Sequence, residues 1–296
     1  MEKIMFFSDS PADLLPEDTV GAPYKMVPSS VMFDDGRFIP ETEVDRLEYY
    51  EYLKTCKNIP THAMGTPGQW HEAFKEAVTG GYTHALIYTI STTASSVYQS
   101  IHLAHEMLEA EHPGSLNIVL IDSRQYSMVY GRLLLESFEQ NKQGWTFQRI
   151  VDDLRERTRR NQAVLGTYSL RCMQKSGRIS GMSALVGSAL GIKPVLLARN
   201  GVIAPVTKVR GSRHLIPAVV QQVSERIIAP ETQHLTLVHG SVPPGEIERL
   251  ETMLNEKIKP LSIARHTIGV TVITNCGPET IGVGYYGEGY SEETGE

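Results

Sequence analysis

Hydroxyl and carboxyl side chains follow three short apolar runs of the sequence. Residues 8–10 (SDS) follow IMFF, residues 91–93 (STT) follow HALIYTI, and residues 122–123 (DS) follow NIVLI. Such side chains orient a ligand by hydrogen bonds, and a hydroxyl with a base beside it can act as a nucleophile. A serine by itself indicates neither ligand binding nor catalysis, because its hydroxyl commonly caps a helix or stabilises a turn.

The sequence lacks the common motifs of nucleotide binding, nucleophilic catalysis and metal binding. Neither GxxxxGK[ST] nor a GxGxxG after the first apolar run is present, so nucleotide chemistry loses most of its support, and no GxSxG elbow accompanies the serines. The three cysteines lack CxxC spacing, and the ten histidines include no HExxH. We expect no cofactor, no metal site and free thiols.

Two histidines near predicted turns are candidates for a carboxylate contact. His62 precedes the turn at residues 65–68, and His266 lies near the last apolar segments. The alternative for each is an exposed loop histidine. His102 and His105 share one helical face without further ligands, which favours surface residues over a metal site.

The elements that must position these side chains follow from the apolar pattern. Strands at 4–7, 84–90 and 117–121 alternate with helical stripes, which is the rhythm of a parallel α/β sheet. The carboxyl ends of its strands share one edge, where open α/β sheets bind ligands. One stripe begins after 91–93, so Thr93 or a neighbour is the expected N-cap.

The second half mixes short β-prone runs with helices, as expected of a separate α/β or α+β domain. Strands are expected at 164–168, 192–197, 202–206 and 235–238, and helices at 215–223 and 247–258. Strands at 269–273 and 280–283 flank the turn NCGP and predict a hairpin.

Small residues dominate a helical pattern at 181–191. Either it packs closely against another helix, or it borders a slot that admits an alkyl chain. Burying one methylene contributes ~0.8 kcal/mol, so about fourteen contribute on the order of 11 kcal/mol before the costs of binding.

Chain length and net charge limit the number of domains and the kinds of partner that we expect. The 296 residues exceed a typical single domain, and we expect domains at 1–160 and 161–288 with a flexible Gly/Glu-rich tail at 289–296. A formal net charge of −6 opposes non-specific nucleic-acid binding, and the basic cluster at 155–160 is expected on a solvated helix face. No apolar stretch suits a spanning helix or a signal peptide, so a cytoplasmic location is expected.

Several segments in order resemble the DegV family, which includes the fatty-acid-binding subunits of bacterial fatty acid kinases, often called FakB proteins. The resemblance spans almost the whole chain and is carried by SDSPADL at 8–14, VPSSVMF at 27–33, THAMGTPGQW at 61–70, ISTTASSVYQS at 90–100, IDSRQYSMVYG at 121–131, LRCMQKSGRIS at 170–180 and GIKPVL at 191–196.

The resemblance implies a two-domain α/β protein with a ligand cleft between its domains. It further implies that the chain binds a fatty acid and presents the carboxyl group to a separate acyl kinase, in phospholipid metabolism and with transient membrane contact. The residues that match the family's head-group positions are Asp9, Ser10, Ser91, Thr92 and the pair Asp122-Ser123, and Thr61 is the candidate to substitute for the family's threonine. The segment KVRGSR at 208–213, with Lys208 and Arg210, resembles a family region that faces the kinase, and Arg178 is a further basic residue expected to contact it; ordinary solvated residues are the alternative.

Two positions depart from the family pattern. His62 stands near the family's usual threonine in a segment that reads TSQPS in relatives, and Asn275 stands where a histidine is usual. Asparagine donates a hydrogen bond but cannot become cationic, so head-group recognition is weakened, rearranged around His62, or directed at another ligand. The rival hypothesis is a stand-alone enzyme that acts on a small carboxylate or an ester through the Ser/Asp cluster and His62.

Overall fold

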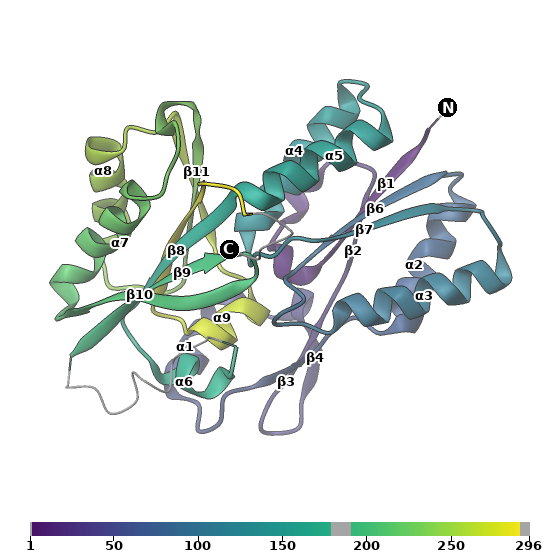
Figure 1. The fold of residues 1–296 in the computed structure, drawn as a ribbon. Coiled ribbons are helices and arrows are strands. Elements are labelled where there is room, and N and C mark those ends of the chain that lie inside the picture. The colour runs from purple at the N-terminus through teal and green to yellow at the C-terminus, as the bar shows by residue number, and fades with distance from the viewer. Residues whose placement is uncertain (1, 179–190, 291–296) are drawn as a thin grey trace.

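The computed structural model describes residues 2–178 and 191–290. A four-stranded parallel sheet with the order β2-β1-β6-β7 organises the first half of the chain (Figure 1). Its strands are β1 (Ile4–Asp9), β2 (Tyr24–Val27), β6 (His84–Thr89) and β7 (Asn117–Asp122). The parallel α/β fold expected from the alternation of strands and helices is thus confirmed.

Helices cover both faces of this sheet, with α2 and α3 on one side and α4 and α5 on the other (Figure 1). They are α2 (Pro67–Thr79), α3 (Val97–Glu111), α4 (Met128–Lys142) and α5 (Phe147–Arg160). The predicted apolar stripes face inward, since Trp70, Phe74 and Ile101 are all buried. Helix α2 begins with a capping box, in which Thr66 accepts a hydrogen bond from the Gln69 N–H.

The start of α3 differs from the expected one. Ser96 occupies the N-cap and makes no side-chain capping bond, so Thr93, which was expected with its neighbours as the cap, does not cap the helix. The Thr93 hydroxyl instead contacts the Gly201 carbonyl oxygen and the Ser91 hydroxyl. These hydrogen bonds hold Thr93 and its neighbours in a turn, and helix α3 therefore begins only at Val97.

A six-stranded mixed sheet organises the second half, with the order β10-β9-β8-β13-β11-β12. Its strands are β8 (Asn161–Thr167), β9 (Ile192–Arg199), β10 (Val202–Arg210), β11 (His234–His239), β12 (Ser262–Thr267) and β13 (Thr280–Tyr286). Only the β11–β12 pair is parallel. Helices α7 (Leu215–Ser224) and α8 (Glu246–Lys257) pack together against it and confirm the two predicted helices (Figure 1).

A small antiparallel sheet with the order β4-β3-β5 also forms within the first half of the chain. It consists of β3 (Ser30–Met32), β4 (Phe38–Pro40) and β5 (Thr61–Ala63), and the nearby helices are α1 (Arg46–Thr55) and α6 (Arg171–Ser176). Strand β5 carries Thr61 and His62, so His62 does not lie in the exposed loop that was its alternative.

The hairpin expected over 269–283 is wrong, because residues Val270–Cys276 form helix α9. The β-branched run VTVIT favours a strand locally. The helix is stabilised by two buried carboxyl groups that accept its first N–H groups: Gly269 N–H donates to Asp13 at 2.7 Å and Thr271 N–H to Glu41 at 3.0 Å. Tertiary partners far away in the sequence thus override local propensity.

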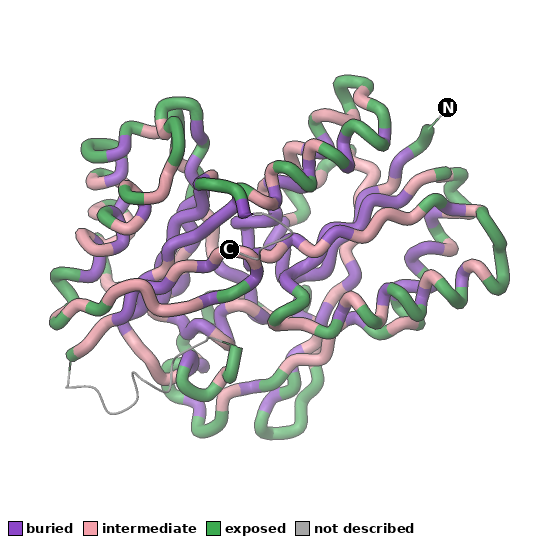
Figure 2. Tube along the Cα trace, viewed as in Figure 1, coloured by how far each residue is buried: buried purple, intermediate pink, exposed green. Residues whose placement is uncertain are grey.

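Buried residues form two apolar clusters that follow the two main sheets (Figure 2). Val270 and Ile273 of α9 belong to the cluster of the first half, although α9 comes near the end of the chain. Helix α9 therefore joins the two halves. Of the expected tail, only Gly289 and Tyr290 are described, and Tyr290 is 7% exposed. The small-residue segment 181–190 lies outside the described residues.

Candidate functional site

The ends of β1, β6 and β7 meet at one sheet edge, as the parallel order requires. Their polar groups bond to one another: the Ile90 N–H donates to Asp9 at 3.1 Å, and the Thr92 hydroxyl donates to Asp122 at 2.6 Å. The sequence therefore identified a true cluster. Most of its polar atoms are nevertheless used to hold the loops together.

Three of the predicted ligand contacts are fully buried in this cluster. Asp9 accepts a hydrogen bond from the Tyr130 hydroxyl at 2.7 Å, and burial raises the pKa of Asp9 to about 7. Ser91 bonds to Thr93, and the Ser123 hydroxyl donates to the Gln125 carbonyl oxygen. These three residues and Thr92 do not line the two pockets described below.

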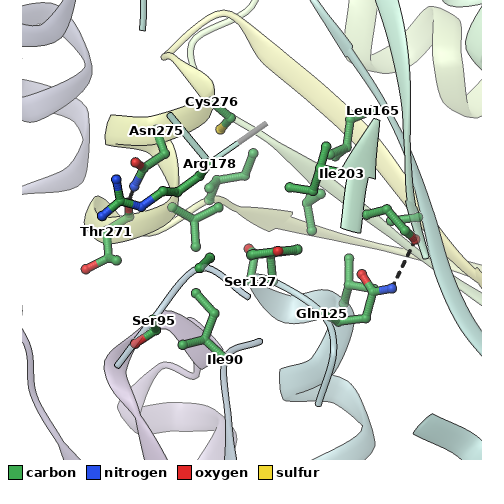
Figure 3. A pocket seen from close by; sticks show the side chains of 18 of the residues that line it. Ile90, Ser95, Gln125, Ser127, Leu165, Arg178, Ile203, Thr271, Asn275 and Cys276 are labelled. Carbon is green, nitrogen blue, oxygen red and sulfur yellow. Dashed lines mark hydrogen bonds between the residues drawn. The ribbon is translucent and has the colours of Figure 1, made fainter. Parts of the chain in front are cut away.

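An apolar pocket lies between the first sheet's edge and the second sheet (Figure 3). This inner pocket has a cavity of about 70 Å³. Its apolar walls come from α4, from the end of β6 and from four strands of the second sheet, and they include Ile90, Val129, Leu165, Ala198, Ile203 and Val238. Both halves of the chain thus build the pocket.

A wider and more polar space of about 490 Å³, the outer pocket, opens beside it. The two pockets share the lining residues Met64, Ala94, Ser95, Arg178, Thr271 and Asn275. Figure 3 shows Arg178, Thr271 and Asn275 together at one end, with Leu165 and Ile203 toward the other. The site is therefore polar at its mouth and apolar inside.

His62 and Thr61 line the outer pocket, as the sequence expected of a carboxylate site. The Nδ1 atom of His62 lies 3.5 Å from the Thr271 hydroxyl, and Nε2 is buried without a hydrogen-bond partner among the described residues. Burial is the main cause that lowers the pKa of His62 to about 4. The imidazole is therefore neutral at pH 7.

Behind His62 stands a buried carboxyl group that the sequence reasoning missed. Glu41 accepts hydrogen bonds from the hydroxyls of Ser10 at 2.6 Å, Ser29 at 2.6 Å and Thr271 at 2.8 Å. Ser10, a predicted ligand contact, is thus part of the support for the site. Nothing in the sequence around Glu41 marks it, because its partners come from distant segments.

The remaining predicted residues separate into two groups. Asn275 lines both pockets, and its amide donates to the Thr271 carbonyl oxygen at 2.8 Å, one helical turn earlier. Arg178, expected to face a partner, also lines both pockets and is exposed. Lys208 and Arg210 are exposed on β10 and do not line the site.

A second carboxyl group, Asp13, connects the pocket wall to α9. Asp13 accepts hydrogen bonds from the Gly269 N–H and from the Ser127 hydroxyl. Ser127 lines the inner pocket and has the unusual φ of +57°, which these contacts stabilise. Ser95 lines the inner pocket but was not predicted as a site residue. It lies within the segment ISTTASSVYQS, and its position just after a predicted strand could have identified it.

The described residues contain no cluster of three or more histidine, cysteine, aspartate or glutamate side chains suited to a metal ion. Among the helices of the same residues, none combines the length and apolar character that crossing a membrane requires.

Comparisons with known proteins agree with this architecture. A sequence profile described as an uncharacterised protein of the DegV family matches residues 3–288. A DegV domain-containing protein of Staphylococcus aureus (strain COL) is 30% identical over 264 residues, covering 89% of this chain and 90% of the relative.

Solved structures are similar over nearly the whole chain. A DegV family protein from Thermus thermophilus, described by its fatty acid binding, has a TM-score of 0.85 at 21% identity and covers 97% of this chain and 100% of its own. DegV from Bacillus subtilis, described as a fatty acid binding protein, has a TM-score of 0.81 at 22% identity with the same coverage. At these identities the likeness establishes a shared fold.

Proposed function

The chain belongs to the DegV family, and on that premise we propose that it binds a long-chain fatty acid. The acyl chain occupies the inner pocket, and the carboxyl group lies in the outer pocket near Thr61, His62 and Asn275. The observation that carries this proposal is the continuity of the two pockets through their shared lining residues. An apolar pocket with a few polar groups at one end suits a ligand with a polar head and an apolar tail.

The acyl chain supplies most of the affinity in this arrangement, at ~0.8 kcal/mol for each buried methylene. A cavity of about 70 Å³ has room for roughly two waters at ~30 Å³ each, which is less than a long chain occupies. Binding therefore requires lining side chains to move apart. Met64, at the junction of the pockets, is suited to this because its unbranched side chain adapts its shape readily.

Blocking the junction provides the direct test. We expect Ala94→Trp to prevent binding of oleate, because Ala94 lines both pockets and lies in a turn. Ala110→Trp, on the exposed end of α3, is the matched control and should bind like the unmodified chain. Native mass spectrometry with added oleate measures the stoichiometry. Oleate bound equally by both variants would place the ligand elsewhere.

The proposal further assigns the chemistry to a separate acyl kinase, to which this protein presents the carboxyl group in the cytoplasm. The absence of a phosphate-binding motif from the sequence supports it, and Arg178 and Lys175 at the open mouth offer a partner a basic contact. With ATP and oleate, the protein alone should form no acyl phosphate in a hydroxamate assay, whereas the kinase subunit from the same cells should restore it. Acyl phosphate formed without a kinase, or sustained ester hydrolysis, would support the stand-alone enzyme.

A further inference from the structure

The Nε2 atom of His62 is a buried nitrogen whose hydrogen-bonding capacity is unused. No described residue bonds to it, although His62 lines the outer pocket. Buried polar atoms in folded proteins nearly always have a partner. An atom of the ligand is therefore the expected partner, and the chemistry of Nε2 limits which atom that is.

The other ring nitrogen indicates which tautomer His62 adopts. The Thr271 hydroxyl lies 2.8 Å from a Glu41 carboxylate oxygen and 3.5 Å from His62 Nδ1. A carboxylate is the stronger acceptor at the shorter distance, so the hydroxyl hydrogen goes to Glu41. The Thr271 oxygen then faces Nδ1 with a lone pair and favours hydrogen on Nδ1. In the neutral ring this leaves Nε2 as an acceptor.

The charges around His62 keep the ring neutral before a ligand arrives. Burial lowers its pKa most, Glu41 acts in the opposite direction, and Arg178 lowers it further. Lys175 lines the same pocket and adds positive charge at the mouth. The surroundings therefore combine one nearby carboxylate with two cations, and the ring has a pKa of about 4.

An ionised carboxylate cannot pair with this nitrogen, because both would be acceptors. We propose that a fatty acid enters the site together with one proton from solvent, which the carboxyl group and His62 Nε2 share as a single hydrogen bond. No covalent bond changes, and the bound pair is neutral overall, either as acid and imidazole or as carboxylate and imidazolium. This inference rests on the proposed fatty-acid function and adds the protonation state of its ligand.

Arg178 provides the competing arrangement. Its side chain is exposed and lines both pockets, so it can pair with an ionised carboxylate directly. In that case His62 stays neutral and no proton is taken up. The number of protons bound with the ligand therefore distinguishes the two arrangements.

Titration calorimetry with decanoate in two buffers of different ionisation enthalpy measures that number. Between pH 6 and 8 the free carboxylate, with a pKa of about 4.3 like a glutamate side chain, carries no proton, and neither does free His62 Nε2. We expect close to one proton taken up for each decanoate bound. The association constant should then fall about tenfold for each unit of rising pH while the complex keeps its proton.

Two controls isolate His62. 1-Decanol has a chain of equal length and brings its own hydroxyl hydrogen to Nε2, so its binding should be independent of pH and of the buffer. His62→Gln cannot titrate but can donate to an ionised carboxylate, so its decanoate binding should lose the proton uptake. Binding of 1-decanol by this variant verifies that its pocket is intact, and His102→Gln on the exposed face of α3 should behave like the unmodified chain.

The possible results distinguish a failure of the shared-proton arrangement from a failure of the proposed fatty-acid binding. Decanoate that binds with no proton uptake overturns the shared-proton arrangement and leaves fatty-acid binding in place, with Arg178→Gln then expected to weaken affinity. Proton uptake that persists in His62→Gln also overturns it. If neither decanoate nor oleate binds, the proposed function itself fails.

Discussion

At the scale of single residues, Asp13 shows how one buried side chain controls several elements. It accepts hydrogen bonds from Gly269 and Ser127, and burial is the largest cause that raises its pKa to about 7. The folded chain therefore holds this proton more tightly than the unfolded chain. The contribution of the protonated group to stability is complete below about pH 4 and is lost as the pH rises through about 7.

Asp13→Asn should flatten this pH dependence. Between pH 5 and 7 we expect the free energy of unfolding of the unmodified chain to fall by on the order of 2 kcal/mol more than that of the variant, because each pKa unit is worth about 1.4 kcal/mol. Urea unfolding at the two pH values measures the difference. Asp152→Asn on the exposed face of α5 is the control and should keep the original slope. Equal slopes for Asp13→Asn would mean that Asp13 is ionised throughout.

Gly269 allows Asp13 to approach α9. A Cβ atom at this position would lie 1.9 Å from the Asp13 Oδ1 atom. Gly269→Ala should therefore cost about 1 to 3 kcal/mol of stability, as overpacking does elsewhere. Gly68→Ala is the control, since its Cβ would have no neighbour closer than 4.0 Å and the site is helical. Thermal unfolding should show a loss for the first and none for the second.

At the scale of elements, α9 depends on two carboxyl groups, Asp13 and Glu41, that its own segment does not contain. Glu41→Gln should weaken it, because an amide has one acceptor oxygen and Glu41 uses both of its oxygens. We expect a loss of roughly 1 to 3 kcal/mol, the cost of leaving buried donors unpaired. Glu43→Gln, exposed in the same turn, should be neutral in the same denaturant experiment. Similar losses for the two variants would remove Glu41 from this role.

The same dependence explains what the sequence predicted and what it missed. The stripe with Trp70 and Phe74 and the alternation of apolar runs with helices predicted the α/β fold, since both are local patterns. The helix at 270–276 was missed because the partners that cap it lie more than 200 positions earlier. Asn275 was noticed only as a departure from a family pattern, whereas His62 was noticed both in this way and by its place before a predicted turn, and both residues line the outer pocket.

The sequence located the polar residues at the ends of β1, β6 and β7 but did not reveal their roles. Their shared edge follows from parallel topology, but their roles depend on which partners they choose. Ser91 and Ser123 bond to neighbouring loop atoms, whereas Thr271, in a run that resembles a strand, lines both pockets. Pattern alone does not reveal such pairings, because each hydroxyl has several partners of similar strength within reach.

At the scale of the whole molecule, the two halves meet in the pocket walls. We propose that the domain boundary lies between residues 160 and 161, where α5 ends and β8 begins. Each wall of the inner pocket then comes from a different domain. A ligand that bridges them should stabilise both, since binding only to the folded state adds free energy to it.

Saturating oleate should therefore raise the melting temperature of the intact chain. At a free concentration 100 times the dissociation constant the gain is about 2.7 kcal/mol. For a protein of this size it corresponds to a shift of several degrees, at about 2 to 4 °C for each kcal/mol. Scanning fluorimetry measures this shift, and Ala94→Trp should show none. A shift of equal size in that variant would mean that oleate binds outside the pocket.

All three cysteines of the chain are buried, and Cys276 lines the inner pocket. Burial raises the pKa of Cys172 to about 11 and that of Cys276 to about 12, so a thiol-specific dye reacts with them only when the surrounding structure opens. The unmutated protein thus contains its own reporter groups. The rate at which a dye labels Cys276 measures how often the pocket walls separate, before any label has been engineered into the chain.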